Sequence, residues 1–284
     1  MSLLSPLDRC RVMGVLNVTP DSFSDGGLHI NPEAAVSAGL EMVTLGADLI
    51  DVGGESTRPG AKTVSVEIEL ARVVPVVRAL SARGVVVSVD TTKAEVATAC
   101  LDAGAAVVND VSCARDVELL KVVASHGVPY ILMHNRAVSA EMSQHADYGD
   151  CLAEVCGELR AGLVRVVDAG IDLDLVVIDP GLGFAKRAEH NWELLAGIPR
   201  LLELGHPVLI GASRKSFLGS VLADRGGAPR PVGAREDATQ AITALVASEG
   251  VWAVRVHEVG PAVDAVRVVA AVNAARAAKE RSNP

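Results

Sequence analysis

Eight short apolar runs alternate with longer stretches of helical spacing, and this alternation is the strongest limit on the fold. The runs cover residues 11–18, 48–53, 85–90, 106–111, 129–134, 175–179, 207–211 and 252–257. Helical spacing is found, for example, over residues 32–45, 66–82, 93–103, 148–169 and 237–248. Alternating strands and helices predict a parallel sheet, and eight such units predict a closed (β/α)₈ TIM barrel of the α/β class. A doubly wound open sheet is the alternative, but no G-x-G-x-x-G motif follows the first run.

The chain length fits a single barrel domain. A sequence of 284 residues is ordinary for one (β/α)₈ unit, so we expect one domain over residues 1–284, with a frayed tail at 279–284. Half of the residues are apolar but only 2% are aromatic, which predicts a core of branched aliphatic side chains. The turn-rich segment 224–235 is expected at the surface.

Composition also excludes several classes of function. The net charge is −9 and no basic block is present, which argues against a nucleic-acid surface. No apolar run reaches the roughly 18 residues of a membrane span, and the first nine residues lack the apolar core of a signal peptide. The five cysteines are odd in number and form no C-x-x-C pair. We therefore expect reduced thiols and a cytoplasmic location.

Polar residues gather where the predicted strands end. The barrel places all carboxyl ends at one mouth, where the chemistry of this fold is found. A single aspartate at a strand end is more often a helix cap than a site residue, but a complete set of polar ends is hard to attribute to capping. The set comprises Asn17, Asp51, Asp90, Asn109, Asp110, His134, Asp179, Ser213 to Lys215, Arg255 and His257.

The strand-end residues divide into two chemical groups. Asp90, Asn109 and Asp179 can accept and donate hydrogen bonds along the edge of a nitrogen-rich heterocycle. Arg255 and His257 are donors suited to pyrophosphate, and their alternation sends both side chains to the same side of a strand. Taken singly, Arg255 also fits a salt bridge at the rim, and His257 fits a structural histidine.

The first strand leads into a polar loop with three oxygen ligands. Asn17, Asp21 and Asp25 lie close together in sequence, and oxygen ligands suit Mg²⁺ beside substrate phosphates. The same residue types are common in turns, so this segment alone leaves both interpretations open.

Four motifs in chain order resemble those of the dihydropteroate synthases. Residues 17–23 read Asn-Val-Thr-Pro-Asp-Ser-Phe, which is similar to the first family signature at every defined position. A second strand and glycine-rich loop over residues 46–60, the Asp-Pro-Gly-Leu-Gly-Phe segment at 179–184 and the Ser-Arg-Lys-Ser-Phe segment at 213–217 follow it. The resemblance continues to Arg255 and His257 and so covers nearly the whole chain.

The resemblance implies an activity and a site. Family members are transferases of folate biosynthesis that condense (7,8-dihydropterin-6-yl)methyl diphosphate with 4-aminobenzoate and release pyrophosphate. It implies Mg²⁺ bound through Asn17. It implies catalytic roles for Asp90, Asp179, Lys215, Arg255 and His257. The same five residues, with Thr57 and Asn109, would bind the pterin diphosphate.

The second substrate would bind beside two loops, residues 22–28 and 57–59. The resemblance assigns its site to Phe23, Asp25, Arg58, Pro59, Phe184 and Ser216. Packing in the core is an equally good reading of Phe184. Sulfonamide inhibition and a homodimer are also implied, the homodimer supported by the apolar helical stretches 238–247 and 262–278. Cys113 lies in a segment, 111–115, where many relatives have a glycine-rich stretch.

Three other functions fit parts of the pattern. A pterin-binding methyltransferase domain would share the aspartate and asparagine strand ends but would not need Arg255 and His257. A catalytically silent pterin-binding paralogue would lack loop residues such as Asp25 and Arg58, which are present here. An unrelated barrel aldolase would use Lys215 to form a Schiff base.

Overall fold

The computed structural model describes residues 3–5, 7–19, 31–56, 63–137 and 142–281. Eight strands form one parallel sheet in the order β6-β5-β4-β3-β2-β1-β8-β7. A parallel bridge between Ile178 and Val208 brings the two edges together, so the predicted barrel is confirmed. The strands are β1 (Arg11–Asn17), β2 (Leu49–Gly53), β3 (Val87–Asp90), β4 (Val107–Asp110), β5 (Tyr130–Met133), β6 (Val176–Asp179), β7 (Leu209–Ile210) and β8 (Ala253–Val256).

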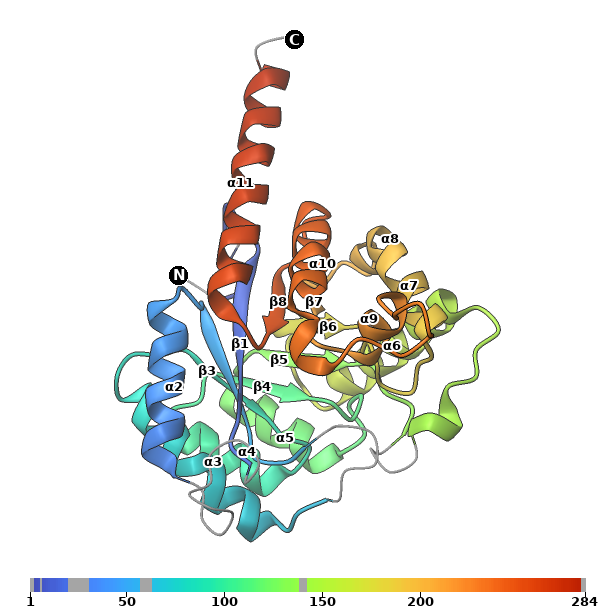
Figure 1. The fold of residues 1–284 in the computed structure, drawn as a ribbon. Helices are drawn as coiled ribbons and strands as arrows, with labels where there is room; N and C mark the ends of the chain where they lie inside the picture. Colours follow the sequence, from blue (N-terminus) through green and yellow to red (C-terminus); the bar gives the residue numbers. More distant parts are fainter. Residues whose placement is uncertain (1–2, 6, 20–30, 57–62, 138–141, 282–284) are drawn as a thin grey trace.

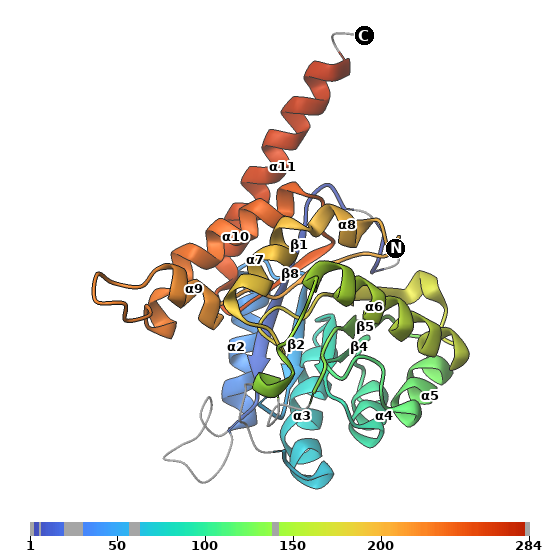
Figure 2. The same ribbon diagram turned by 90° about the vertical axis from the view of Figure 1, so that its right-hand side faces the viewer.

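Helices surround the barrel, as Figures 1 and 2 show. Their bounds agree with the predicted helical stretches to within a few residues. Several begin at a side-chain cap: Asn31 accepts the amides of Glu33 and Ala34, and Asp116 caps the helix Val117–His126 in the same way. The helices are α2 (Pro32–Thr44), α3 (Val66–Ser81), α4 (Ala94–Asp102), α5 (Val117–His126), α6 (Cys151–Asp168), α7 (Ala188–Ala196), α8 (Ile198–Leu202), α9 (Ser216–Val221), α10 (Glu236–Ser248) and α11 (Val259–Arg281).

The last helix reaches into the segment where a frayed tail is expected. α11 continues through Arg281, so residues 279–281 have a helical backbone. Lys279, Glu280 and Arg281 follow an alanine-rich stretch, and all of these residue types favour the helix. In both ribbon views the C-terminal half of α11 extends away from the barrel.

An apolar layer closes the amino-terminal end of the barrel interior. Its members are buried and come from the early positions of seven strands. They are Met13, Leu49, Val107, Ile131, Val177, Leu209 and Ala253. A second and larger core of Val, Leu, Ile and Ala lies between the sheet and the helices, as the composition predicts. Because one end of the barrel is filled, a site can form only at the carboxyl ends of the strands.

Three further features bear on the sequence expectations. All five cysteines are buried free thiols. The segment 224–235 is largely exposed, with a short 3₁₀ turn at Val232–Ala234. Among the described residues, no helix combines the length and the apolar character that crossing a bilayer requires.

Candidate active site

A second layer of inward-facing side chains lies above the apolar layer, at the mouth of the barrel, and it contains most of the polar strand-end residues. Side chains two residues apart point to the same face, so the position two after each interior apolar residue also faces the barrel interior, nearer the mouth. Ser88 is the interior residue of β3, which leads to Asp90 in the same way. The resulting ring consists of Val15, Asp51, Asp90, Asn109, Met133, Asp179, Gly211 and Arg255, of which Val15, Met133 and Gly211 are not polar.

Two buried carboxylates in this ring share one arginine. Arg255 donates from Nε to Asp51 Oδ2 at 2.6 Å and from a terminal nitrogen to Asp90 Oδ2 at 2.7 Å. Asn109 Nδ2 donates to the same Asp51 oxygen at 2.9 Å. The Oδ1 atoms of Asp51 and Asp90 are buried and have no partner among the described residues. Buried acceptors are normally paired, so these two oxygens indicate that a ligand with N–H donors completes the cluster.

Burial and neighbouring charges have opposing effects on the pKa values of Asp90 and Arg255. Burial raises the pKa of Asp90 to about 7, although the neighbouring Arg255 opposes the rise. Burial alone would lower the pKa of Arg255, but Asp51 and Asp90 outweigh it and the pKa is raised. Asp90 therefore gains or loses its proton near neutral pH, while Arg255 stays charged.

Asp179 of the ring and Lys215, the residue before α9, form a second group of charges at the site. Asp179 Oδ1 accepts the amide of Gly181 at 2.7 Å, and burial raises the pKa of this carboxyl group. Burial lowers the pKa of Lys215 to about 8. Its Nζ donates to the Leu182 carbonyl and lies 4.6 Å from the centroid of the Phe184 ring. This part of the site thus combines an acceptor, a cation and a flat apolar surface.

An apolar cluster beside the ring forms the wall of the site. Phe184 packs with Val111, Met133 and Ala185, and all four are buried. Val111 follows β4 and Met133 ends β5, so the loops after β4, β5 and β6 meet here. Phe184 is therefore part of a small cluster at the barrel mouth and separate from the large core.

The two glycines after Asp179 pack against protein groups. Both have positive φ, 67° at Gly181 and 76° at Gly183. A Cβ on Gly181 would overlap the His134 carbonyl oxygen, and one on Gly183 would lie 3.0 Å from Lys215 Cδ. These glycines keep the loop after β6 close to β5 and to Lys215.

His257 and Ser216 lie at the edge of the site. Ser213 Oγ contacts His257 Nδ1 at 3.0 Å and accepts the His257 amide at 3.2 Å, which fixes the imidazole ring. Ser216 is exposed and is the first residue of α9. Asn17 is the last residue of β1 and is partly exposed, next to Gly53 of β2.

Six candidate residues lie outside the described part of the chain. They are Asp21, Phe23, Asp25, Thr57, Arg58 and Pro59. Within the described ranges no group of three His, Cys, Asp or Glu side chains could hold a metal ion. A single oxygen ligand such as Asn17 still suits Mg²⁺, which usually keeps several waters and binds substrate phosphates.

The structure places two further groups at the site that the sequence did not single out: Asp51, and the contact of Lys186 with His134. Asp51 was one of several strand-end residues, yet it accepts bonds from both Arg255 and Asn109. Below the loop after β6, Lys186 Nζ lies 2.8 Å from His134 Nδ1, and His134 Nε2 lies 2.9 Å from Glu158 Oε2. Burial lowers the pKa of His134 to about 4, so its imidazole is neutral. The interior position of Asp51, two after Leu49, was the available signal.

Comparisons with known proteins point to one family. The family model for pterin binding enzymes matches residues 13–257. The dihydropteroate synthase of Mycobacterium leprae is 54% identical over 263 residues, which cover 92% of this chain and 93% of the relative. The Xanthomonas albilineans dihydropteroate synthase solved with 4-aminobenzoic acid has a TM-score of 0.86 and 46% identity, over 94% of each chain. The Yersinia pestis enzyme solved in a sulfonamide drug complex has a TM-score of 0.87 and 41% identity, over 95% and 96%.

Proposed function

Given that this chain belongs to the dihydropteroate synthase family, we propose how its strand-end ring carries out the synthase reaction. The observation that carries the proposal is the pair of buried, unpartnered oxygens on Asp51 and Asp90 beside Arg255. A pterin presents several N–H donors along one edge and acceptors along another. It would satisfy these oxygens and use the donors of Asn109 and Lys215.

The pterin would lie between the ring and the apolar wall. Asp179 keeps acceptor capacity beyond its bond from Gly181, and Lys215 supplies a cation beside Phe184. The Val111, Met133 and Phe184 wall would cover one face of the flat ring system. Ionised Asp90 and Asp179 would also stabilise positive charge that develops on the pterin during the reaction.

The leaving group requires positive charge at the mouth. His257, held by Ser213, and Arg255 would bind the diphosphate, together with Thr57. Asn17 would hold Mg²⁺, which neutralises charge on the diphosphate when it is bound. The cleavage would break the bond between the pterin methylene carbon and oxygen, and the electron pair would leave with pyrophosphate.

The new bond would form between the methylene carbon and the amine nitrogen of 4-aminobenzoate. Because the carbon has become strongly electrophilic, the weakly nucleophilic amine can attack before it loses a proton, and the proton then passes to solvent. This order needs no general base, and none of the ring positions is a histidine. We place the enzyme in the cytoplasm, where its five free thiols would stay reduced.

One assay tests the proposed function. The pterin diphosphate, 4-aminobenzoate and Mg²⁺ are mixed with the protein, and pyrophosphate and 7,8-dihydropteroate are measured. We expect both products in equal amounts. Pterin binding without turnover would instead identify a silent paralogue. Covalent trapping of Lys215 by borohydride and a carbonyl substrate would identify an aldolase.

The second substrate and sulfonamides would share a site. Phe184 and Ser216 lie on the loop after β6 and at the start of α9, and Phe23, Asp25, Arg58 and Pro59 would complete this site. We expect sulfonamides to compete with 4-aminobenzoate and to bind more tightly when pyrophosphate and Mg²⁺ are present, because the diphosphate would order the site first. Titration with and without pyrophosphate measures this coupling, and equal affinities would contradict it.

A further inference from the structure

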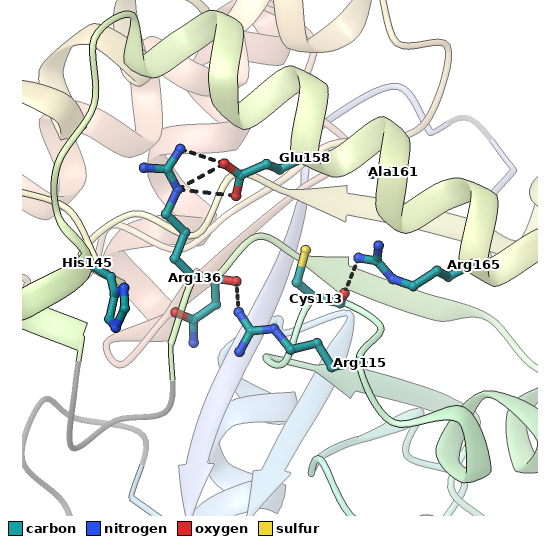
Figure 3. Close-up of a pocket in the computed structure, with 8 residues that line it drawn as sticks. Cys113, Arg115, Arg136, His145, Glu158, Ala161 and Arg165 are labelled. Carbon is teal, nitrogen blue, oxygen red and sulfur yellow. Dashed lines mark hydrogen bonds and ion pairs between the residues drawn. The ribbon is translucent and has the colours of Figure 1, made fainter.

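A cavity lies outside the active-site ring, between α6 and the loops that follow β4 and β5 (Figure 3). Its volume is about 380 Å³, which falls in the range of about 300–1,000 Å³ for small-ligand pockets. We call it the cationic cavity; the residues that define it are Arg115, Asn135, Arg136, His145, Glu158 and Arg165.

The lining of this cavity has an excess of positive charge. It contains three arginines, one histidine and one glutamate, whereas the whole chain has a net charge of −9. Arg136 is neutralised, since it pairs with Glu158 and, at 2.6 Å, with Glu154. Among the described residues, no carboxylate lies within ion-pair distance of Arg115 or Arg165. Within the part of the chain that the structure describes, two guanidinium groups at one cavity therefore have no carboxylate partner.

Both of these arginines are held in place but keep free donors. Arg115 donates to the Asn135 carbonyl. Arg165 donates from Nε to the Ala114 carbonyl at 3.1 Å and from a terminal nitrogen to the Cys113 carbonyl at 2.9 Å. A guanidinium has five N–H donors, so each group can still bind an oxyanion while its protein bonds fix its position. In Figure 3, His145 lies at the opposite end of the view from Arg165.

The loop after β4 is built in an unusual conformation that orients Arg165. Cys113 and Ala114 are consecutive non-glycine residues with positive φ, 65° and 56°. Such residues are costly and persist where the surroundings fix them, often at functional sites. Here Asp110 Oδ2 accepts the Ala114 amide at 3.0 Å, and both carbonyls accept from Arg165. The conformational energy that Cys113 and Ala114 require fits a binding site whose arginines are in place before a ligand binds.

We propose that the cationic cavity binds a phosphate dianion, either free phosphate or the phosphate of a monoester. Arginine matches the geometry of phosphate oxygens, and two guanidinium groups match its double charge. The cavity is separate from the active-site ring, because none of the residues that line it belongs to that ring. Its test therefore does not depend on synthase activity.

The first experiment locates the ion. Crystals of the whole enzyme are soaked in sodium selenate, a phosphate analogue whose selenium scatters anomalously. We expect an anomalous peak within hydrogen-bond distance of Arg115 or Arg165. Absence of a peak there, in crystals that show selenate elsewhere, would overturn the proposal.

The second experiment measures affinity in solution. Calorimetry with inorganic phosphate and with a nucleoside monophosphate compares wild type, Arg115→Gln, the double variant Arg115→Gln/Arg165→Gln and the control Arg160→Gln. Arg160 is exposed on the same helix as Arg165 but does not line the cavity. Arg115→Gln removes only one protein hydrogen bond, so this variant is expected to fold even if the double variant does not.

The outcomes are distinct. We expect wild type and Arg160→Gln to bind one more phosphate than the double variant. We expect Arg115→Gln to bind that phosphate with at least tenfold lower affinity. Binding of both compounds indicates the phosphate group of a larger molecule, and binding of inorganic phosphate alone indicates the free ion. Equal stoichiometry and affinity in all four proteins would refute the site, as would binding of neither compound.

Discussion

At the scale of single residues, the site depends on one cation shared by two buried acids. Arg255 joins Asp51 and Asp90, so its charge both stabilises the carboxylates and faces the reacting diphosphate in the proposed mechanism. Removing one partner of such a cluster leaves an uncompensated buried charge, which is more costly than the loss of one bond. The contribution of Arg255 is therefore visible both in turnover and in the protonation of its partners.

Arg255→Ala is expected to lower kcat about 10–150-fold, because a hydrogen bond to a charged group contributes about 1.5–3 kcal/mol. Pterin binding is expected to weaken less than turnover, since Asn109, Asp179 and Lys215 remain. Steady-state kinetics at saturating pterin diphosphate, with Arg276→Ala on α11 as a control, measure the difference. A variant with the kcat of wild type would remove Arg255 from the mechanism.

The protonation of Asp90 predicts a pH dependence of pterin binding. The pKa of Asp90 is raised to about 7, so the carboxyl group is ionised above that pH and becomes protonated as the pH falls through it. If the carboxylate accepts a pterin N–H, affinity is expected to decrease by roughly tenfold per pH unit below 7. Calorimetry with a pterin that lacks the diphosphate tests this. Asp90→Asn should bind weakly at every pH, and a pH profile of wild type that matches that of the variant would contradict the role of Asp90.

At the scale of elements, the loop after β6 is positioned by close packing against β5. Gly181 lies against the His134 carbonyl, and Lys186 bonds to both His134 Nδ1 and the Phe184 carbonyl. These contacts within the protein therefore hold Asp179 and Phe184 in position, and no ligand is needed for this.

Two glycine substitutions separate backbone conformation from this packing. Gly170, after α6, has φ of 86° and no neighbour within 4 Å of a new Cβ. Gly170→Ala is expected to cost about 1–2 kcal/mol of unfolding free energy, the usual cost of a left-handed residue. Gly181→Ala adds overlap with His134 and is expected to cost about 2–5 kcal/mol. Urea unfolding measures both, and equal losses would show that the contact with His134 is unimportant.

The elements were predictable from sequence because their signals are local. Apolar runs located all eight strands, and helical spacing located several helices to within a few residues of their bounds. The partners inside the ring were not predictable. Asp51 meets Arg255 only because β1 lies between β2 and β8 in the closed sheet, and no pattern within either strand encodes that pairing. The His134 and Lys186 contact likewise joins two loops that are distant in sequence.

At the scale of the whole molecule, α11 extends beyond the barrel. Figures 1 and 2 show its C-terminal half away from the sheet, and α10 packs beside its other half. Val268 and Val272 lie one turn apart on the same face and are 64% and 44% exposed. Leu245 of α10 is 62% exposed. Exposed apolar side chains on neighbouring helices are typical of an interface.

These surfaces predict a homodimer that uses α10 and α11. A stable interface buries about 800 Å² on each partner, and a projecting helix with an apolar face can supply much of that area. Light scattering at micromolar concentration is expected to give twice the monomer mass of 29.4 kDa. Val268→Asp/Val272→Asp should shift the protein to monomer, because the new carboxylates would be buried without partners. Val117→Asp is the control, since Val117 on α5 is similarly exposed, at 57%, far from α11 in the barrel order. A dimer that survives the double substitution would place the interface elsewhere, and a monomeric wild type would refute the homodimer.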